Sequence, residues 1–279
     1  MKAVVVLGGG GAKAVAHAGA WKALVESGAE IVEVVGTSMG AVMGAALVQG
    51  TSPDQLLETA RSLGSKDVAT LDRLALLKGV FAANILKPDA LRQTIARLVP
   101  ATTFEALRIP LTVTTTDLDT GELVLFGARG RAPAPLPDVL YASCALPLYF
   151  PPAEINGRRL ADGGLRAVLP LAVAATIPAD VVVAVHVGSG FDEQPPPSST
   201  ASNRPPPPLL RAHDSAIRIL MAAQTERAIA AWPAGAPRLV VVRPVAERGA
   251  TFAVGQSDRY FAAGYEETVR RLDGQGWLT

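Results

Sequence analysis

A serine between two glycines is the residue of this chain best suited to do chemistry. The run VVGTSMGA, residues 34–41, sets Ser38 between Gly36 and Gly40 at the junction of an apolar strand and an expected helix. This is the G-x-S-x-G pattern of a nucleophile elbow, whose sharp turn exposes the serine hydroxyl. Flanking glycines avoid clashes where the strand folds back into the helix. We therefore predict that Ser38 is the nucleophile of a hydrolase, and the alternative is a small-residue turn that happens to contain serine.

A run of four glycines, Gly8 to Gly11, follows the apolar residues 3–7. A strand, a glycine turn and a helix start leave backbone N–H groups without partners, so the turn can receive a phosphate or a developing oxyanion. Ala14 occupies a position where a dinucleotide fingerprint requires glycine, and no acidic ribose partner ends the second strand, which ends at Ser38. This favours an oxyanion hole, while nucleotide binding and plain tight packing stay open. The glycines expected to form the hole are Gly9, Gly10 and Gly11.

An aspartate before two glycines supplies a third motif, Asp162-Gly163-Gly164. Alone, such a tripeptide is usually a turn. Behind a glycine loop and a G-x-S-x-G elbow, however, it makes the chain resemble the patatin-like phospholipase family, whose signature is these three motifs in this order. The likeness spans roughly residues 3 to 188 and is far more specific than any one motif. It also includes AHAG at 16–19, IPL at 109–111, TDLDTGE at 116–122 and ASCALP at 142–147.

The resemblance implies an α/β fold, a patatin-like three-layer α/β/α arrangement with a mostly parallel central sheet. It also implies an acyl hydrolase that cleaves lipid esters through a dyad of Ser38 and Asp162 and needs no cofactor. Supporting positions of the motifs are Lys13, Gly36, Gly40, Gly163 and Gly164. The chain departs from the family pattern at Ala14, at Lys13, where arginine is commoner, and before Pro170, where asparagine is often found.

The group that deprotonates Ser38 is the main mechanistic question, because a serine hydroxyl needs a positioned base. The chain has three histidines, of which His17 falls inside the first expected helix and His213 follows a proline-rich segment. His186 is the serious rival to a direct Ser-Asp dyad. It ends an apolar strand, and the order Ser38, Asp162, His186 is that of an α/β-hydrolase triad. The elbow arrives too early for that fold, so the dyad is favoured and the triad esterase stays as the alternative.

Composition narrows the class of protein. The 279 residues, 49% of them hydrophobic, are enough for one large α/β core or two modest ones. A net charge of +1 gives no reason to expect nucleic acid as a partner. The single cysteine, Cys144, is expected to be packed, and no Cys-His cluster suggests a metal. Neither a secretory signal nor a bilayer-length apolar stretch of ~20 residues is evident, so we expect a cytoplasmic protein.

The chain is expected to form a single patatin-like domain over 1–279. It includes a Pro-rich loop at 195–208 and a C-terminal strand-helix extension at about 209–279. Strands are predicted near 3–7, 32–36, 110–116, 122–126, 181–187 and 238–243. Helices are predicted near 12–27, 39–49, 53–63, 88–98, 209–231 and 258–273. The pair of strands around 119–121 should be antiparallel and lie at an edge.

Apolar residues within 63–100, including Leu71, Leu74 and Leu77, recur at helical spacing. Most such stripes are core, but these residues could instead contact acyl chains or a membrane surface peripherally. Two non-catalytic classes also stay open. One is an inactive lipid-binding module, and the other is a nucleotide-binding protein that uses the glycine loop for phosphate.

Overall fold

The computed structural model describes all residues except 69, 71, 73–83, 195–206, 249–253 and 275–279. The strands are β1 (Lys2–Leu7), β2 (Glu30–Thr37), β3 (Leu111–Asp117), β4 (Leu123–Gly127), β5 (Ala153–Ile155), β6 (Arg158–Asp162), β7 (Val181–Val185) and β8 (Arg238–Val242). The α-helices are α1 (Val15–Glu26), α2 (Met39–Gln49), α3 (Pro53–Ser62), α4 (Ser65–Val68), α6 (Pro88–Leu98), α7 (Leu136–Cys144), α8 (Leu171–Ala174), α9 (Pro208–Ala230) and α10 (Ser257–Asp273). Short 3-10 turns include η1 (Gly11–Ala14) and η4 (Gly163–Leu165).

One mixed sheet organises these elements, in the order β5-β6-β3-β2-β1-β7-β8, with β4 paired to β3. The strands β3, β2, β1, β7 and β8 are mutually parallel, whereas β4, β5 and β6 join by antiparallel pairing. The carboxyl ends of β1 and β2 are therefore neighbours, because Leu7 pairs with Gly36. The glycine run directly follows β1 and Ser38 directly follows β2, so the topology brings them to one edge of the sheet.

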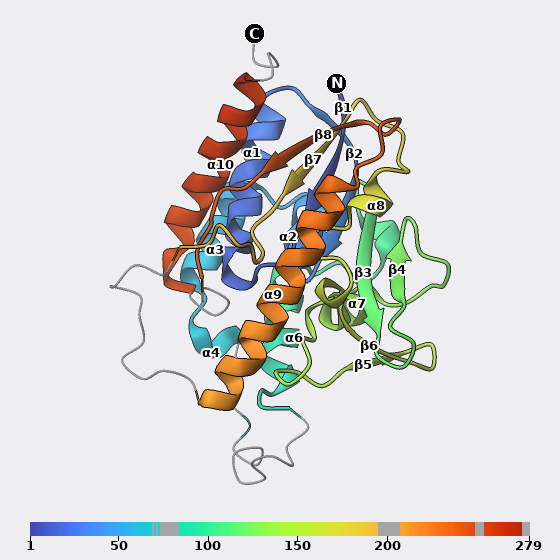
Figure 1. Cartoon of the computed structure of the whole chain (residues 1–279), viewed down its shortest axis with the longest axis vertical. Coiled ribbons are helices and arrows are strands. Elements are labelled where there is room, and N and C mark those ends of the chain that lie inside the picture. The colour runs from blue at the N-terminus through green and yellow to red at the C-terminus, as the bar shows by residue number, and fades with distance from the viewer. Residues whose placement is uncertain (69, 71, 73–83, 195–206, 249–253, 275–279) are drawn as a thin grey trace.

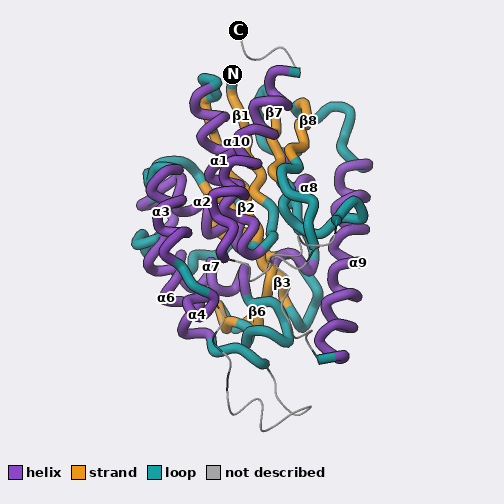
Figure 2. The backbone as a smooth tube through the Cα atoms, turned by 90° about the vertical axis from the view of Figure 1, so that its left-hand side faces the viewer, coloured by secondary structure: helices purple, strands orange, loops and turns teal. Residues whose placement is uncertain are grey.

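Helices cover both faces of the sheet (Figures 1 and 2). Successive residues of β1 point to opposite faces: Val5 and Leu7 join a large core with α1, α2, α6 and α7, and Val4 and Val6 join a smaller core. In the smaller core, α8 contributes Leu171, and Ile229 of α9 packs against it. The result is the three-layer α/β/α fold with a mostly parallel sheet that the sequence predicted. Figure 2 shows the sheet between the group of α1, α2 and α10 and the pair of α8 and α9.

The six predicted strands and six predicted helices are all present, with ends that differ by a few residues. Unforeseen elements are β5, β6 and α7, together with the short helices. The antiparallel pair was also correct, because β3 and β4 pair around the turn at 119–121. The leucine stripe at 71–81 and most of the Pro-rich loop lie outside the described residues. Pro208, the last residue expected in that loop, is the first residue of α9.

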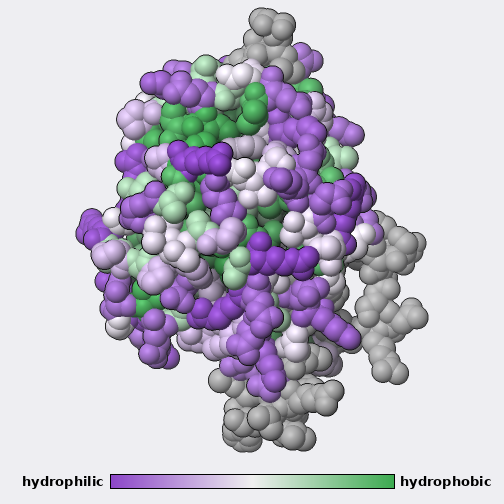
Figure 3. Space-filling view, turned by 180° about the vertical axis from the view of Figure 1, so that it is seen from behind, coloured by the Kyte–Doolittle hydropathy of each residue, from purple (hydrophilic) through white to green (hydrophobic). Residues whose placement is uncertain are grey.

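The face seen from behind mixes charged and polar side chains with smaller apolar areas, which is ordinary for a protein surface (Figure 3). None of the helices in the described part of the chain is long and apolar enough to cross a bilayer.

Candidate active site

Ser38 lies in the turn between β2 and α2, with a backbone φ of 56° and ψ of −136°. A non-glycine residue in such a conformation costs on the order of 1–3 kcal/mol, so the surrounding structure must hold it there. The two flanking glycines make this possible. A Cβ at Gly36 would lie 2.5 Å from the Ala41 Cα, and one at Gly40 would lie 2.2 Å from the Leu7 carbonyl oxygen. Both positions therefore require glycine for the close packing that forms the turn.

Asp162 ends β6 and meets Ser38 directly. The Ser38 hydroxyl donates a hydrogen bond of 2.7 Å to Oδ2 of Asp162, across 124 positions of sequence. The other carboxylate oxygen accepts the N–H of Gly164 at 2.7 Å, within the turn formed by the Asp-Gly-Gly motif. The backbone of Asp162 is also fixed, because its carbonyl accepts from the Thr116 hydroxyl and its N–H donates to Ala145. The carboxylate is thus held facing the serine.

Burial sets the basicity of this carboxylate. Asp162 is 5% exposed. Desolvation raises its pKa to about 6, against the opposing effect of the hydrogen bonds from Gly164 and Ser38. A carboxyl group with this pKa is still mostly ionised at neutral pH, and it is a much better proton acceptor than an exposed aspartate.

The glycine loop lies against Ser38, since a Cβ at Gly9 would be 3.2 Å from the Ser38 Cβ. The N–H of Gly8 donates to Val185 and that of Gly9 donates to Val168, at 3.1 and 3.2 Å. In the part of the chain that the structure describes, the N–H groups of Gly10 and Gly11 have no acceptor. Gly9 was expected to be an oxyanion donor, but its N–H is already engaged in fixing the loop. Gly10 and Gly11 are the two expected donors that keep a free N–H.

Ser143 also belongs to the candidate site, although the sequence did not single it out. Its hydroxyl accepts the N–H of Ser38 at 2.8 Å and donates to the Thr114 carbonyl at 2.7 Å. The N–H of Ser38 is consequently occupied, and the turn that carries Ser38 is tied to β3. The residue belongs to the ASCALP segment, and the place of that segment in the motif pattern was the only available signal. Neighbouring Cys144 is buried, which raises its pKa well above the usual range and makes it an unreactive packed thiol.

The two buried histidines lie on the glycine-loop side of the site. His17 Nε2 lies 2.8 Å from the Gly8 carbonyl oxygen, and burial lowers its pKa to about 4. The ring is therefore neutral at pH 7, and Nε2–H donates to that carbonyl. Burial, aided by the nearby charges of Arg243 and Lys13, lowers the pKa of His186 to about 3. Within the described residues, neither ring hydrogen-bonds to Ser38 or Asp162, and Nδ1 of His186 has no partner.

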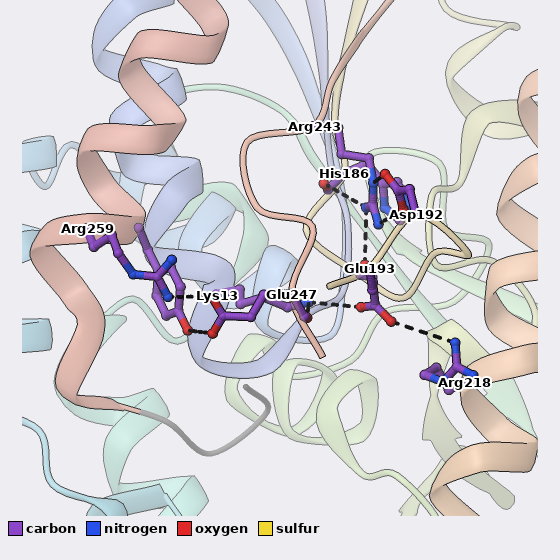
Figure 4. A network of polar contacts seen from close by, with 10 residues as sticks. Lys13, His186, Asp192, Glu193, Arg218, Arg243, Glu247 and Arg259 are labelled. Atoms are coloured by element: carbon purple, nitrogen blue, oxygen red, sulfur yellow. Dashed lines mark hydrogen bonds and ion pairs between the residues drawn. The ribbon is translucent and has the colours of Figure 1, made fainter. Parts of the chain in front are cut away.

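A network of charges, buried at Lys13, Glu193 and Glu247, surrounds Lys13, two residues beyond Gly11 (Figure 4). The Lys13 ammonium donates to the Glu247 carbonyl at 2.9 Å and to Glu193 Oε1 at 3.4 Å. The second Glu193 oxygen lies 3.8 Å from Arg218 of α9, and Arg259 of α10 pairs with the Glu247 carboxylate. Burial lowers the pKa of Lys13, and Glu193 opposes that shift. The network joins the turn after the glycine loop to both C-terminal helices.

Helix α9 runs along the side of the site that holds Asp162. Gln224 donates to the carbonyl of Leu165 at 2.7 Å, and Asp214 accepts from the Tyr149 hydroxyl at 2.6 Å. A Cβ on Gly164 would lie 3.2 Å from the terminal methyl of Met221. Helix α9 therefore walls the site next to the Asp-Gly-Gly turn.

Comparison with known proteins gives a consistent result. Residues 5–175, more than half of the chain, match the family model described as patatin-like phospholipase. An uncharacterised NTE family protein of Mycobacterium bovis is 38% identical over 184 residues, covering 66% of this chain and 48% of that protein. Human patatin-like phospholipase domain-containing protein 6 is 30% identical over 187 residues, covering 66% of this chain but 13% of that protein. The chain thus matches about half of its mycobacterial relative and a small part of its human one.

Two solved structures also resemble the chain. VipD from Legionella pneumophila has a TM-score of 0.49 at 14% identity, covering 98% of this chain and 66% of that one. ExoU from the type III secretion system of Pseudomonas aeruginosa, solved in complex with SpcU, has a TM-score of 0.46 at 14% identity. The match covers 100% of this chain and 53% of that one.

Proposed function

Because this chain belongs to the patatin-like phospholipase family, we propose that it is a lipid acyl hydrolase in which Ser38 is the nucleophile and Asp162 the base. The observation that carries the proposal is the 2.7 Å hydrogen bond from the Ser38 hydroxyl to the Asp162 carboxylate. No histidine stands between them in the described part of the chain, so the proton has a direct acceptor.

The reaction would proceed in two steps. Ser38 Oγ attacks the ester carbonyl carbon while its proton passes to Asp162, and the N–H groups of Gly10 and Gly11 receive the negative charge of the carbonyl oxygen. When the tetrahedral intermediate collapses, Asp162 returns the proton to the departing alcohol and an acyl-serine remains. Asp162 then takes a proton from water as the water oxygen attacks the acyl-serine, and it returns that proton to Ser38 Oγ when the C–O bond to serine breaks and the fatty acid leaves. Each step uses the same two side chains, and none needs a cofactor.

Contact with a lipid surface is part of the proposal, because the substrate class resides there. Three large apolar side chains of α9 support it: Leu209 is 67% exposed, Ile219 is 47% exposed and Leu220 is 60% exposed. They lie on the helix that walls the site, and apolar side chains on a helix surface can enter the interfacial region of a membrane. We propose that the protein resides in the cytoplasm and contacts the membrane peripherally. We do not propose nucleic acid as a partner.

Two measurements test the hydrolase assignment. A fluorophosphonate probe should label the parent protein at Ser38, and ester turnover should vanish in both Ser38→Ala and Asp162→Asn while circular dichroism stays unchanged. Removing both residues should cost little more than removing one, because the two act as a unit. Turnover in Asp162→Asn within a few-fold of the parent would refute the dyad. Absence of labelling and turnover in the parent would favour a non-catalytic lipid-binding or nucleotide-binding protein.

A further inference from the structure

A small apolar cavity adjoins the glycine loop and the nucleophile turn, among α1, α2, α3 and α6. Its volume is about 50 Å³. The cavity is lined by apolar side chains that include Val15, Met43, Leu56 and Leu98. Two residues with hydroxyl groups, Thr94 and Ser257, also line it. A cavity lined in this way offers little to a charged or hydrogen-bonding group and suits an alkyl chain.

The cavity adjoins both segments that would hold the ester carbonyl, the glycine loop and the Ser38 turn. Gly11 and Met39 both line it. Gly11 is the last glycine of the oxyanion loop, and Met39 directly follows Ser38 in sequence. An ester carbonyl bound between Ser38 and the loop N–H groups would therefore contact Gly11, which lines the cavity, and Ser38, whose neighbour Met39 lines it.

The direction of proton transfer separates the two arms of the substrate. Asp162 has to return its proton to the departing oxygen, so the alcohol arm must lie beside Asp162. That side is walled by Gly164 and by Met221 of α9. The alkyl arm on the carbonyl carbon has to leave in another direction. Among the described residues, Gly11 and Met39 both line this apolar cavity, which offers such a direction.

The size of the cavity limits what it can hold. A cavity of about 150 Å³ accommodates benzene, so one a third of that size holds roughly two or three carbons without rearrangement. The flexible side chains of Met39 and Met43 can adjust to a ligand, whereas Leu56 and Leu98, which line the cavity from α3 and α6, are buried in the core. Longer alkyl arms would have to displace packed core side chains, which is costly.

We infer that this cavity is the acyl-chain subsite and that it selects esters with short acyl groups, of about four carbons. The inference rests on the proposed hydrolase function. It predicts that kcat/KM for p-nitrophenyl esters rises by about fourfold per methylene while the arm still fits, from acetyl to butanoyl, because each methylene leaves water. Beyond butanoyl, kcat/KM should stop rising and then fall.

Variants of the lining test the assignment against a matched control. Leu98→Ala should enlarge the cavity and move the optimum to hexanoyl or octanoyl esters. Leu91→Ala truncates another leucine buried on the same helix, one that does not line the cavity, and should leave the optimum where it was. Ala60→Leu fills the cavity from α3, so it should depress butanoyl turnover at least tenfold and change acetyl turnover little.

The outcomes are separable. If Leu98→Ala does not fold, Leu63→Ala tests the same enlargement at a half-buried position of the lining. One outcome is that the parent, the enlarged variant and the filled variant all turn over esters with the same dependence on chain length. That result would overturn the subsite assignment but leave the hydrolase assignment intact. A parent optimum at dodecanoyl would also overturn it. If no ester of the series is hydrolysed and Ser38 is not labelled, the hydrolase assignment fails and the subsite fails with it.

Discussion

The Lys13 ammonium lies 3.4 Å from the Glu193 carboxylate, although the two residues are 180 positions apart. Both side chains are almost completely buried, at 6% and 2% exposure. Lys13 belongs to the turn that follows the glycine loop, whereas Glu193 lies beyond the 5–175 stretch that matches the family model. A segment outside the family region thus supplies the countercharge for a residue inside the motif.

This pairing leads to a prediction for Glu193→Gln. The substitution leaves a buried ammonium without its carboxylate, which typically costs about 3–5 kcal/mol when a buried pair is broken. We expect a lower free energy of unfolding in urea and a lower kcat, because the turn that carries Gly11 loses its anchor. Asp192→Asn is the control, since Asp192 pairs with Arg243 at a site where the carboxylate is 54% exposed. Equal losses from the two substitutions would contradict the role of Glu193.

The pH dependence of activity should follow Asp162. Its carboxyl group must be ionised to accept the serine proton, and burial raises its pKa to about 6. We therefore expect kcat/KM for an uncharged short ester to be constant above pH 7 and to fall tenfold per unit below about pH 6. The pKa values of His17 and His186 are about 4 and 3, so their titration cannot produce a fall near pH 6. A midpoint near pH 4 would contradict the burial argument.

The same raised pKa has the opposite effect on stability. Between about pH 4 and pH 6 the folded protein binds more protons at Asp162 than the unfolded chain does, so this group destabilises the fold as pH rises. The lost stability approaches about 3 kcal/mol above pH 6. Asp162→Asn should therefore be inactive yet at least as stable as the parent at pH 8, and the difference should shrink at pH 4. Thermal unfolding of both proteins at the two pH values measures this, and an Asn variant less stable at pH 8 would contradict it.

Replacing His186 separates the dyad from the triad esterase. Because His186 makes no hydrogen bond to Ser38 or Asp162 in the described structure, His186→Gln should lower kcat by less than about tenfold in a folded protein. Ser38→Ala, assayed beside it, gives the scale of a complete loss. A loss in His186→Gln as deep as that scale, with unchanged circular dichroism, would establish the triad.

Substitution of Gly10 tests the oxyanion loop. A Cβ at this position would lie 2.7 Å from the Val187 carbonyl oxygen, so Gly10→Ala has to move the loop and misdirect the N–H groups. Loss of one such donor typically costs about 10²–10³ in kcat. Gly235→Ala is the control, because a Cβ there meets nothing within 4 Å. Calorimetry should find no binding of NAD, FAD or ATP to the parent; nucleotide binding that Gly10→Ala removes would instead assign the loop to phosphate.

Membrane contact through α9 is tested by Leu220→Asp. The side chain is 60% exposed, so stability should hardly change, whereas burying a new carboxylate at a lipid interface is unfavourable. We expect weaker binding to vesicles of phosphatidylcholine and phosphatidylglycerol in a flotation assay, with unchanged turnover of a soluble ester. Val25→Asp, at the far end of α1 and 54% exposed, should bind like the parent. Equal binding by all three proteins would remove α9 as the contact.

The sequence predicted the long, strongly patterned elements better than the short ones. The apolar strands β1, β2 and β7 and the amphipathic α3 and α6 carry clear periodicity. The hairpin of β5 and β6 was missed because one strand has three residues and the other begins with two arginines. Its turn, Asn156-Gly157, was a usable signal: both residues have positive φ, and Asn-Gly favours a tight hairpin. Helix α7 was missed where prolines at 135 and 137 interrupt the helical pattern.

At the candidate site, too, the sequence predicted some features and missed others. The motifs identified Ser38 and Asp162 as candidates, but spacing in the sequence could not give the 2.7 Å contact between them, which depends on β6 pairing with β3. Motif reasoning also assigned Gly9 an oxyanion role, because a pattern of glycines does not reveal which N–H groups the fold consumes. The contacts of Glu193, Ser143 and Met221 are non-local and carry no pattern of their own. They arise only when distant segments pack together.

The pairing of β1 sets an order for assembly during synthesis. During synthesis β1 precedes its neighbour β2, which leads into the Ser38 elbow within 40 residues. The glycine loop has to wait, because the N–H groups of Gly8 and Gly9 are held by the carbonyls of Val185 and Val168. Until β7 emerges, one edge of β1 is bare, and a nascent chain that already contains both Ser38 and Asp162 lacks the strand that fixes its oxyanion loop. Under the proposed function, the glycine loop is therefore fixed only after both Ser38 and Asp162 have been made.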